Sequence, residues 1–597
     1  MENKLLIDII RKNIQKYGNR DALYFQDNSK AWKPISWNEF GDYIDQASNA
    51  LLELNVAPGE RIAIISRNMP EWTIADYAIQ NIAAVSVPLF STTSESQAAY
   101  IIQETECSVI FVGEQEQYDI AIAIAQKVSL IKKIIVFDSA VTLSPNTPSL
   151  YFSDFLSSGK QFRFAAEIEK RHSVLKSGDL YTIIYTSGTS GEQKGVMLHY
   201  SNLLECVKTH QERLDVNDND VSLAFLPLSH VFERGWSTVA LSLGMTVYYL
   251  RNPKAVIEVI KDVKPTIMCA VPRFFEKTYA GITNAIENSS FIKRWIFNWG
   301  IRIGARRTEY SRIGKPTPAI LNFAYRIADR LVFAKGRQVL GGKIKFMPCA
   351  GAALSEDIVR FFHYVGLNVT YGYGLTETTA TVSCFTREHF KFGSVGKIMP
   401  GLEVKIGENE EILVKGATVM SGYYKKPEAT AAVMKDGWFS TGDAGWIDED
   451  GCIYLKDRIK DIMKTSSGKY IAPQMLETLI GKDKYIEHIA IIGNERKYVT
   501  ALIVPSFDIL YEYAHKQHIV FEDRTELLRN EKIIALFHEI VQTAQKELSS
   551  FEQVKKITLL AEDFTIPGGE LTSTLKIRRK IISEKYKAEI DKMYPVN

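Results

Sequence analysis

Short apolar runs alternate with helical patterns from Arg61 to Asp138. The runs 62–65, 84–87, 109–112 and 134–137 predict strands, and the segments near 71–81 and 94–105 predict helices between them. Strands separated by helices of about ten or more residues are typical of βαβ units with parallel strands. Similar runs return at 267–271 and 344–347. The pattern predicts an α/β fold built on mostly parallel sheets.

The pattern changes after about Gly393. From there to Leu455 the chain is rich in Gly and Asp and carries short strand-like runs, such as 411–414 and 451–455. This predicts a small, mostly antiparallel subdomain at about 393–456. An α+β pattern follows, and the alternating charges from Lys456 to Asp461 are typical of a solvated connector. We therefore expect an N-terminal domain, 1–456, and a small α+β C-terminal domain, 457–597.

Composition excludes some classes of protein and leaves others open. The chain has 72 Lys and Arg against 70 Asp and Glu, so its charge gives no reason to expect a nucleic-acid partner. Its six cysteines are scattered without a Cys-x-x-Cys pair, which is typical of reduced thiols. The first residues predict an amphipathic helix, and no window offers the 18 or so apolar residues of a membrane span. We expect a cytoplasmic protein that at most rests on a membrane.

The segment from Tyr185 to Gly195 carries the strongest chemical signal. Its three glycines let the backbone approach an anion, while four small hydroxyl residues and Lys194 add hydrogen-bond donors and a positive charge. This combination suits a polyphosphate, although the Walker A spacing is absent. A flexible surface loop is the alternative for this segment taken alone.

Three later segments carry weaker signals. In 371–378, Gly-Tyr-Gly exposes an aromatic face on a tight turn that could stack on a purine, and Glu377 offers a hard oxygen ligand for Mg²⁺. In 436–451, Asp443 could accept both hydroxyls of a ribose. Lys576 lies in a basic cluster near the C-terminus. Taken singly, a structural turn, a hairpin turn and a solvated helix start explain these segments equally well or better.

Order and spacing together decide between these alternatives. The glycine-hydroxyl-lysine loop, Tyr-Gly-x-Thr-Glu, Ser-Thr-Gly-Asp, Asp-Arg-x-Lys-Asp and Thr-x-Thr-x-Lys resemble the adenylate-forming (AMP-binding) enzyme family. Within it, the chain resembles long-chain fatty-acid–CoA ligases, because 436–460 is similar to the fatty-acyl-CoA synthetase signature and 226–234 and 271–277 are similar to long-chain members. The resemblance covers about residues 10 to 585.

The resemblance implies two half-reactions that use ATP, Mg²⁺ and coenzyme A. A fatty acid attacks the α-phosphate of ATP, and CoA then displaces AMP from the acyl-adenylate. Asp457 matches the hinge about which the mobile C-terminal domain turns between these steps. The catalytic positions are Lys576, Thr376, His230 and Glu377, and the metal positions are Thr186 and Glu377. The nucleotide- and CoA-binding positions are Thr186, Ser187, Gly188, Thr189, Ser190, Gly191, Lys194, Gly351, Ala352, Ala353, Tyr371, Gly372, Tyr373, Asp443, Arg458, Lys460 and Lys464.

Two residues depart from the family pattern. Gln193 stands where the family usually has proline, and we expect a more mobile loop there with activity retained. Leu575 replaces the glycine that precedes the catalytic lysine in many relatives, so Lys580 is the alternative to Lys576.

Residues 291–340 carry eleven basic and two acidic residues with aromatic residues interleaved. One interpretation is peripheral contact with an anionic membrane. The other is an ordinary helix pair, some of whose arginines contact CoA phosphates.

The expected substrates are fatty acid, ATP and CoA. An oligomer is compatible with the sequence, and so is a ligase that uses a medium-chain, branched or aryl acid or an acyl carrier protein. A nucleotide-binding protein without turnover is disfavoured by Glu377, Asp443 and Lys576.

Overall fold

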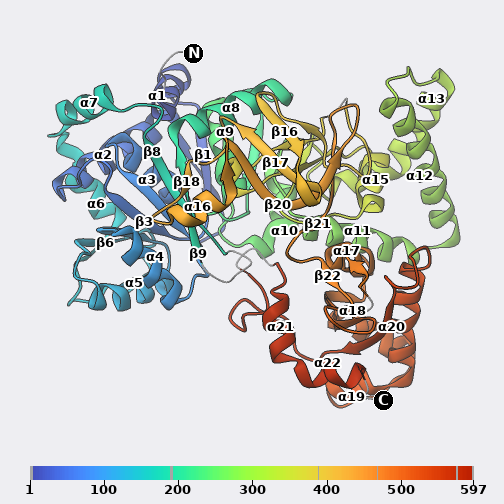
Figure 1. The fold of residues 1–597 in the computed structure, drawn as a ribbon. Helices are drawn as coiled ribbons and strands as arrows, with labels where there is room; N and C mark the ends of the chain where they lie inside the picture. Colours follow the sequence, from blue (N-terminus) through green and yellow to red (C-terminus); the bar gives the residue numbers. More distant parts are fainter. Residues whose placement is uncertain (1–4, 188–192, 387–388, 467, 573–575, 595–597) are drawn as a thin grey trace.

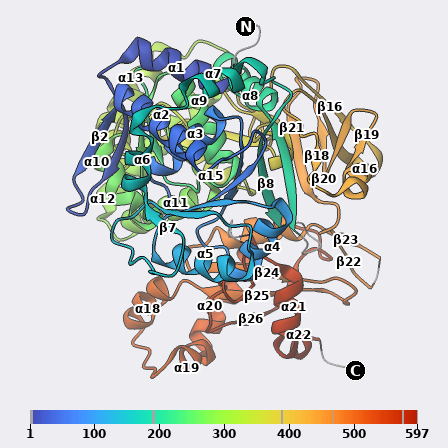
Figure 2. The ribbon, with the colours of Figure 1, turned by 90° about the vertical axis from the view of Figure 1, so that its left-hand side faces the viewer.

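The computed structural model describes residues 5–187, 193–386, 389–466, 468–572 and 576–594. A large part of the chain, blue to yellow in Figure 1, lies above a smaller orange-to-red part, and Figure 2 shows the same arrangement from the side. The molecule is α/β with several mixed sheets, as the sequence predicts. All six cysteines are buried free thiols.

An eight-stranded sheet forms the centre of the large part. Five of its pairings are parallel, whereas β8 pairs antiparallel with β9, and β9 with β18. In spatial order its strands are β18 (Gly422–Tyr423), β9 (Gln193–His199), β8 (Leu180–Ser187), β4 (Val85–Leu89), β3 (Arg61–Ile65), β5 (Val109–Val112), β6 (Lys133–Val136) and β7 (Ser149–Tyr151).

Both faces of this sheet are buried, which explains its continuous apolar runs. In β3, Ile62 and Ile64 join one hydrophobic cluster, while Ala63 and Ile65 join the cluster on the opposite face. The helices of this region are α1 (Leu6–Tyr17), α2 (Trp37–Glu53), α3 (Pro70–Asn81), α4 (Glu95–Thr105), α5 (Gln115–Lys127), α6 (Phe152–Ser158), η1 (Gly159–Gln161) and α7 (Ala165–Val174).

A four-stranded sheet lies beside it, in the order β10 (Val221–Ala224), β11 (Thr246–Tyr249), β1 (Asp21–Gln26) and β2 (Trp32–Ser36). A second four-stranded sheet contains β12 (Met347–Cys349), β13 (Val369–Tyr373), β14 (Ser383–Cys384) and β15 (Lys397–Ile398). The expected strand at 267–271 forms only isolated bridges, at Ile267 and Ala270, and the one at 344–347 is displaced toward β12.

The helices around these two sheets include a long hairpin, α12 and α13, at the edge of the molecule (Figure 1). They are α8 (Tyr200–Arg213), α9 (Val231–Ser242), η2 (Pro253–Ala255), α10 (Val256–Val263), α11 (Pro272–Glu287), α12 (Phe291–Arg312), α13 (Ala319–Ala328), η3 (Asp329–Phe333), α14 (Ala334–Gln338), α15 (Glu356–Tyr364) and η4 (Thr376–Thr378). No helix in the described ranges is long and apolar enough to cross a membrane.

The Gly- and Asp-rich segment forms an antiparallel sheet, as expected. Its elements are β16 (Leu402–Ile406), η5 (Glu408–Glu410), β17 (Glu411–Gly416), α16 (Pro427–Val433), β19 (Met434–Lys435), β20 (Trp438–Ile447) and β21 (Ile453–Arg458).

The expected solvated connector is wrong at Asp457, although Lys456 and Lys460 are exposed as predicted. Lys456 to Arg458 belong to strand β21, and the Asp457 side chain is only 5% exposed. Its carboxylate accepts hydrogen bonds from the backbone N–H groups of Arg458 (2.7 Å) and Gln474 (3.0 Å). Burial raises the pKa of Asp457 to about 6. Charge alternation was a poor guide here, because backbone donors satisfy the carboxylate inside the protein.

The remaining residues have hydrophobic clusters of their own on both faces of a three-stranded sheet. This sheet has the order β24 (Ile486–Ile492), β25 (Val499–Pro505) and β26 (Val554–Leu559). The other elements are β22 (Met463–Lys464), β23 (Tyr470–Ile471), α17 (Pro473–Gly481), α18 (Phe507–Lys516), α19 (Arg524–Arg529), α20 (Glu531–Ala544), α21 (Arg579–Lys585) and α22 (Lys587–Met593).

Candidate active site

The expected phosphate loop joins two strands of the central sheet. Thr186 pairs with Lys194 across the β8–β9 ladder, and Ser187 pairs with Gln193. Gly195 pairs with Tyr185 in this ladder, and a Cβ at Gly195 would lie 2.9 Å from the Tyr185 ring. Glycine is therefore needed at 195 to leave room for the ring. Gly188, Thr189, Ser190 and Gly191 lie outside the described residues, as does most of the loop whose mobility we predicted from Gln193.

Lys194 and Glu377 meet at Tyr423, a residue that the sequence analysis missed. The Lys194 Nζ lies 5.0 Å from the centroid of the Tyr423 ring, and the Tyr423 hydroxyl donates to Glu377 Oε1 at 3.0 Å. Tyr423 comes from β18, which pairs with β9. Only this long-range pairing brings it to the site, so no local signal could have identified it.

A tight loop holds Thr376 and Glu377. The backbone N–H of Leu375 donates to the Thr378 hydroxyl at 3.0 Å, while Thr379 and Ala380 adopt positive φ angles of 51° and 79°. A Cβ on Gly374 would lie 1.6 Å from the carbonyl oxygen of Ala380, which excludes any other residue there. Thr376 is buried and Glu377 is half-buried.

The tight turn expected at Gly-Tyr-Gly, residues 372–374, is wrong. Tyr371 to Tyr373 belong to strand β13 and both tyrosine rings are buried, because Gly372 lets the backbone of Ser383 approach closely. The Tyr373 hydroxyl donates to Asp443 Oδ2 at 2.6 Å, and the Arg458 guanidinium lies 3.1 Å from Asp443 Oδ1. Three expected site residues therefore form one polar group.

Gly351, Ala352 and Ala353 follow β12 in an open turn. Gly351 has a φ of 96°, and a Cβ there would meet no atom within 4 Å. The Tyr371 hydroxyl accepts a hydrogen bond from the N–H of Leu354 at 3.0 Å, which ties this turn to β13. Gly351 and Ala352 are exposed, so no side chain covers the backbone of this turn.

His230 ends a rigidly held loop. Asn68 donates from Nδ2 to the carbonyl oxygens of Ala224 (3.2 Å) and Leu226 (2.7 Å) and accepts from the N–H of Leu228 (3.0 Å). The buried Glu233 accepts from the N–H of Leu226 at 3.2 Å. His230 is the N-cap of α9, and its Nδ1 accepts from the N–H of Phe232 at 3.2 Å.

Lys576 comes from the smaller part of the molecule and approaches the same site. Burial and the positive charge of Lys576 lower the pKa of His230 to about 4. Nearby protein atoms, followed by the charge of Arg458, lower the pKa of Lys576, although the residue is exposed at the surface. Asp443 and Glu377 oppose this shift. Lys576 thus lies within electrostatic range of four expected site residues, His230, Glu377, Asp443 and Arg458.

The other basic positions do not share this arrangement. Lys460 and Lys580 are exposed, as Lys576 is, but neither is among the charges that shift the pKa of His230. Lys464 pairs with Tyr470 in the β22–β23 hairpin, where its Nζ lies 5.6 Å from the centroid of the Tyr470 ring. The fallback Lys580 is unsupported, since Lys576 has the electrostatic neighbours that the role requires.

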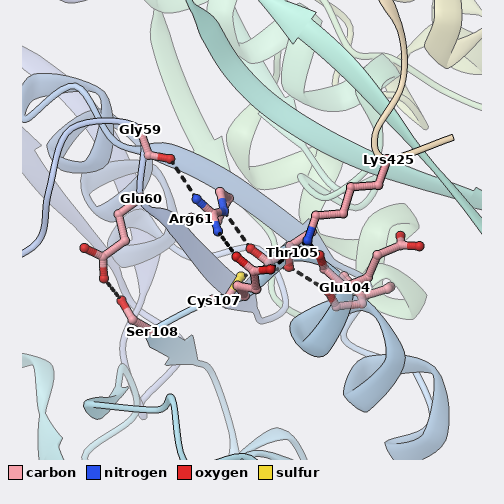
Figure 3. Close-up of polar contacts among 10 residues, drawn as sticks. Gly59, Glu60, Arg61, Glu104, Thr105, Cys107, Ser108 and Lys425 are labelled. Atoms are coloured by element: carbon pink, nitrogen blue, oxygen red, sulfur yellow. Dashed lines mark hydrogen bonds and ion pairs between the residues drawn. The ribbon is translucent and has the colours of Figure 1, made fainter. Parts of the chain in front are cut away.

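A polar cluster supports the chain that carries Tyr423 (Figure 3). Lys425 donates to Glu106 Oε1 at 2.7 Å and to the carbonyl oxygen of Glu104 at 2.9 Å. Arg61 lies 2.9 Å from Glu106 Oε2 and donates to the carbonyl oxygen of Thr105 at 2.6 Å. Glu104 also accepts from the hydroxyl of Tyr185, the residue before Thr186. The C-terminal end of α4 thereby contacts both Tyr185 of β8 and Lys425, which follows β18.

A mostly apolar cavity of about 30 Å³ lies between α8, α9 and β13. Phe232, Gly235 and Trp236 of α9 form part of its wall. Cys206 and His210 of α8 and Leu214, which follows α8, also line it. His210 Nε2 forms a hydrogen bond of 3.0 Å with the Thr381 hydroxyl. Burial lowers the pKa of the His210 imidazole.

Comparison with known proteins gives consistent matches over the whole chain. Residues 10–424 match a family model described as AMP-binding enzyme, and residues 460–596 match the AMP-binding enzyme C-terminal domain. The chain is 31% identical to the long-chain-fatty-acid–CoA ligase FadD15 of Mycobacterium bovis, over 94% of this chain and 92% of the relative. It is 30% identical to long chain acyl-CoA synthetase 3 of Arabidopsis thaliana, over 99% and 92%.

The fold is also found among solved structures. The adenylation domain of the carboxylate reductase from Mycobacterium chelonae superimposes with a TM-score of 0.76 at 22% identity, covering 100% of this chain and 92% of that one. At this identity the likeness concerns the fold alone.

Proposed function

Because the chain belongs to the AMP-binding enzyme family, we propose that it activates a long-chain fatty acid with ATP and transfers the acyl group to coenzyme A. The products are acyl-CoA, AMP and pyrophosphate. The observation that carries this proposal is the approach of Lys576 to His230, Glu377, Asp443 and Arg458 beside the β8–β9 hairpin.

The first half-reaction joins two anions. A carboxylate oxygen of the fatty acid attacks the α-phosphorus of ATP, and the bond from that phosphorus to the bridging oxygen breaks as pyrophosphate leaves. Catalysis must neutralise charge and position the two reactants. Lys576 supplies positive charge between the carboxylate and the α-phosphate, and Lys194 supplies it near the departing phosphates. Neutral His230, whose pKa is about 4, positions the acid without adding charge.

The polar group around Asp443 suits the ribose of the nucleotide. An ionised carboxylate is an acceptor, and Asp443 is fixed from two sides by Tyr373 and Arg458. We assign the adenine to the open turn at Gly351 to Ala353 and the α-phosphate to Thr376. The free backbone at Gly351 supports this assignment, since no side chain obstructs a flat ring there.

The residues fit a magnesium ion that is held mainly by substrate. The described residues contain no cluster of three or more His, Cys, Asp or Glu side chains able to hold a metal alone. Mg²⁺ commonly uses one or two carboxylates together with phosphate oxygens, and Glu377 with Thr186 offers such oxygens. When bound, the ion would neutralise phosphate charge. Tyr423 holds the Glu377 carboxylate in place by its hydrogen bond.

We assign the acyl chain to the cavity between α8, α9 and β13. Its free volume is far below that of an ordinary ligand pocket, so its lining side chains must move to admit a long chain. Gly235 lies on its wall, and a Cβ there would be 3.7 Å from Ala380 and 4.0 Å from Cys206.

The second half-reaction needs a different arrangement. The CoA sulfur attacks the acyl carbon, the bond to AMP breaks, and the thiol proton passes to solvent. We propose that the part of the chain from Asp457 onward turns about Asp457, withdraws Lys576 and brings the Lys464–Tyr470 hairpin to the site. The exposure of Lys464 and Tyr470 supports a role in contacting a partner group. We further propose that the enzyme works at a membrane surface, where long-chain acids accumulate.

Pyrophosphate release across a panel of acids tests the proposal. We expect release with ATP and long-chain acids, and acyl-CoA only when CoA is added. Medium-chain, branched and aryl acids should be poorer substrates. No pyrophosphate with any acid would contradict the proposed activity, and preference for an aryl acid would contradict its substrate class.

A further inference from the structure

The helix hairpin at residues 291–340 leaves an unusual amount of apolar surface uncovered. Nine of the 21 exposed large hydrophobic residues in the described chain lie between Phe291 and Val339. The clearest group lies on α13 and its continuation η3, which stand at the edge of the molecule in Figure 1. Ile320, Phe323, Ile327 and Leu331 are 85%, 66%, 40% and 50% exposed.

These four residues form one stripe, because they follow one another at three or four positions along a helix. The opposite side of the same helix is packed. Tyr325 stacks against the Arg307 guanidinium of α12 at 4.3 Å, and Phe333 and Ala328 are buried in the main core. The hairpin is therefore anchored by one face and presents its apolar stripe outward.

The charges beside the stripe are positive and unpaired. Arg326 and Arg330 are exposed one turn apart next to it, and Lys335 follows. None of these three forms an ion pair within the described residues. The two acidic residues of the segment are neutralised, Glu309 by Arg312 and Asp329 by Arg337 at 2.6 Å.

We propose that this α13 stripe, Ile320, Phe323, Ile327 and Leu331, docks on an anionic lipid bilayer while Arg326, Arg330 and Lys335 contact its headgroups. An amphipathic helix with an apolar face and a basic rim is suited to lie in the plane of the interface. A second copy of the chain fits less well, since a symmetric contact through this face would place unpaired cations against one another. The proposed function enters this inference only as the purpose of docking, which is access to fatty acid dissolved in the membrane.

Co-sedimentation of the full chain with lipid vesicles tests the docking. We expect binding to vesicles that contain phosphatidylserine, weaker binding to pure phosphatidylcholine, and loss of binding as salt rises. The triple change I320S/F323S/I327S and the double change R326E/R330E should each weaken partitioning at least tenfold. Matched controls are V174S/V520S, at sites 67% and 91% exposed, and K254E/K261E, at exposed lysines elsewhere. These controls should bind as wild type does.

Two outcomes would overturn the inference. One is equal binding of wild type and the α13 variants, and the other is a wild-type dimer that the triple variant converts to monomer. Activity separates this inference from the proposed function. The α13 variants should keep wild-type turnover with acid supplied in solution and lose it with acid supplied in vesicles. Vesicle binding without turnover on any acid would contradict the proposed function and leave the docking intact.

Discussion

Glu233 shows how burial can set the chemistry of a single residue. Its side chain is fully buried, and this burial raises the pKa of its carboxyl to about 8. The residue is therefore protonated at neutral pH and supports the loop before His230 as a neutral group, through its hydrogen bond from Leu226. A charged group there would add an uncompensated negative charge beneath the acid site.

This burial gives stability a defined pH dependence. The folded protein holds a proton that the unfolded chain releases above about pH 4.5, so stability should fall from there up to pH 8, with a slope of up to about 1.4 kcal/mol per unit. Glu233→Gln should remove that contribution while keeping an acceptor for Leu226. Urea unfolding from pH 5 to 8.5 measures it, with Glu512→Gln at an exposed site as control. An unchanged pH dependence in Glu233→Gln would contradict the assignment.

Gly235 is the position at which the acyl assignment can be tested most sharply. Gly235→Leu should fill the cavity and reduce kcat/KM for long acids, by about fourfold for each methylene excluded, while sparing short acids. Gly235→Ala adds only ordinary contacts with Ala380 and Cys206 and serves as control. Equal loss of activity for short and long acids would show that the cavity does not hold the acyl chain.

The cluster in Figure 3 has its effect at the level of elements, because it fastens α4 to the chain leaving β18. Lys425→Ala should therefore loosen the strand that carries Tyr423. The lysine is partly exposed, so stability should change by under about 1 kcal/mol. Pyrophosphate release should fall about threefold to tenfold through poorer positioning. Lys415→Ala, at an exposed lysine on β17, is the control. Equal effects of the two variants would argue against the support role.

Local pattern was sufficient for elements whose burial repeats along the chain. Strands β3, β5 and β6, helices α3 and α4 and the antiparallel subdomain all lie close to their predicted positions, because both faces of the central sheet are buried and its strands are apolar throughout. Motifs were sufficient to select Glu377, Asp443 and Lys576 as candidates.

Contacts between distant elements could not be predicted in this way. Tyr423 reaches Glu377 through the β18–β9 pairing, and the Tyr373 hydroxyl donates to Asp443, seventy residues further along the chain. The α8 wall of the cavity was missed for the same reason. The charges around 457 predicted an exposed Asp457, whereas its carboxylate is buried and accepts hydrogen bonds from backbone N–H groups. Each miss depends on which partner a side chain finds after folding.

At the scale of the whole molecule, ion pairs hold the two parts in the arrangement that presents Lys576. Glu487 of β24 lies 2.8 Å from Arg273 and 3.2 Å from Lys277 of α11. Burial raises the pKa of Glu487, but these two cations outweigh burial and lower that pKa below its usual value. Lys484 and Glu287 form a further pair at 2.6 Å. A turn of the smaller part would have to break these contacts.

Glu487→Gln should therefore favour the second half-reaction at the expense of the first. A partly exposed pair is worth up to about 1 kcal/mol, so the ratio of adenylation to thioester formation should fall by up to about fivefold. Separate assays of pyrophosphate release and of acyl-CoA formation from supplied acyl-adenylate measure this ratio. An unchanged ratio, or the same change in Glu512→Gln, would contradict a role for the pair in the balance between arrangements.

The central claim is that Lys576 completes an adenylating site on the larger part of the chain. Lys576→Ala tests it directly, with Lys580→Ala as the matched control at an exposed lysine four residues further along the chain. The two half-reactions are measured separately, as pyrophosphate release from ATP and long-chain acid and as acyl-CoA formation from supplied acyl-adenylate. The account predicts that Lys576→Ala loses at least a hundredfold in the first and little in the second, with Lys580→Ala near wild type in both. Equal loss in both half-reactions, or no loss in either, would contradict it.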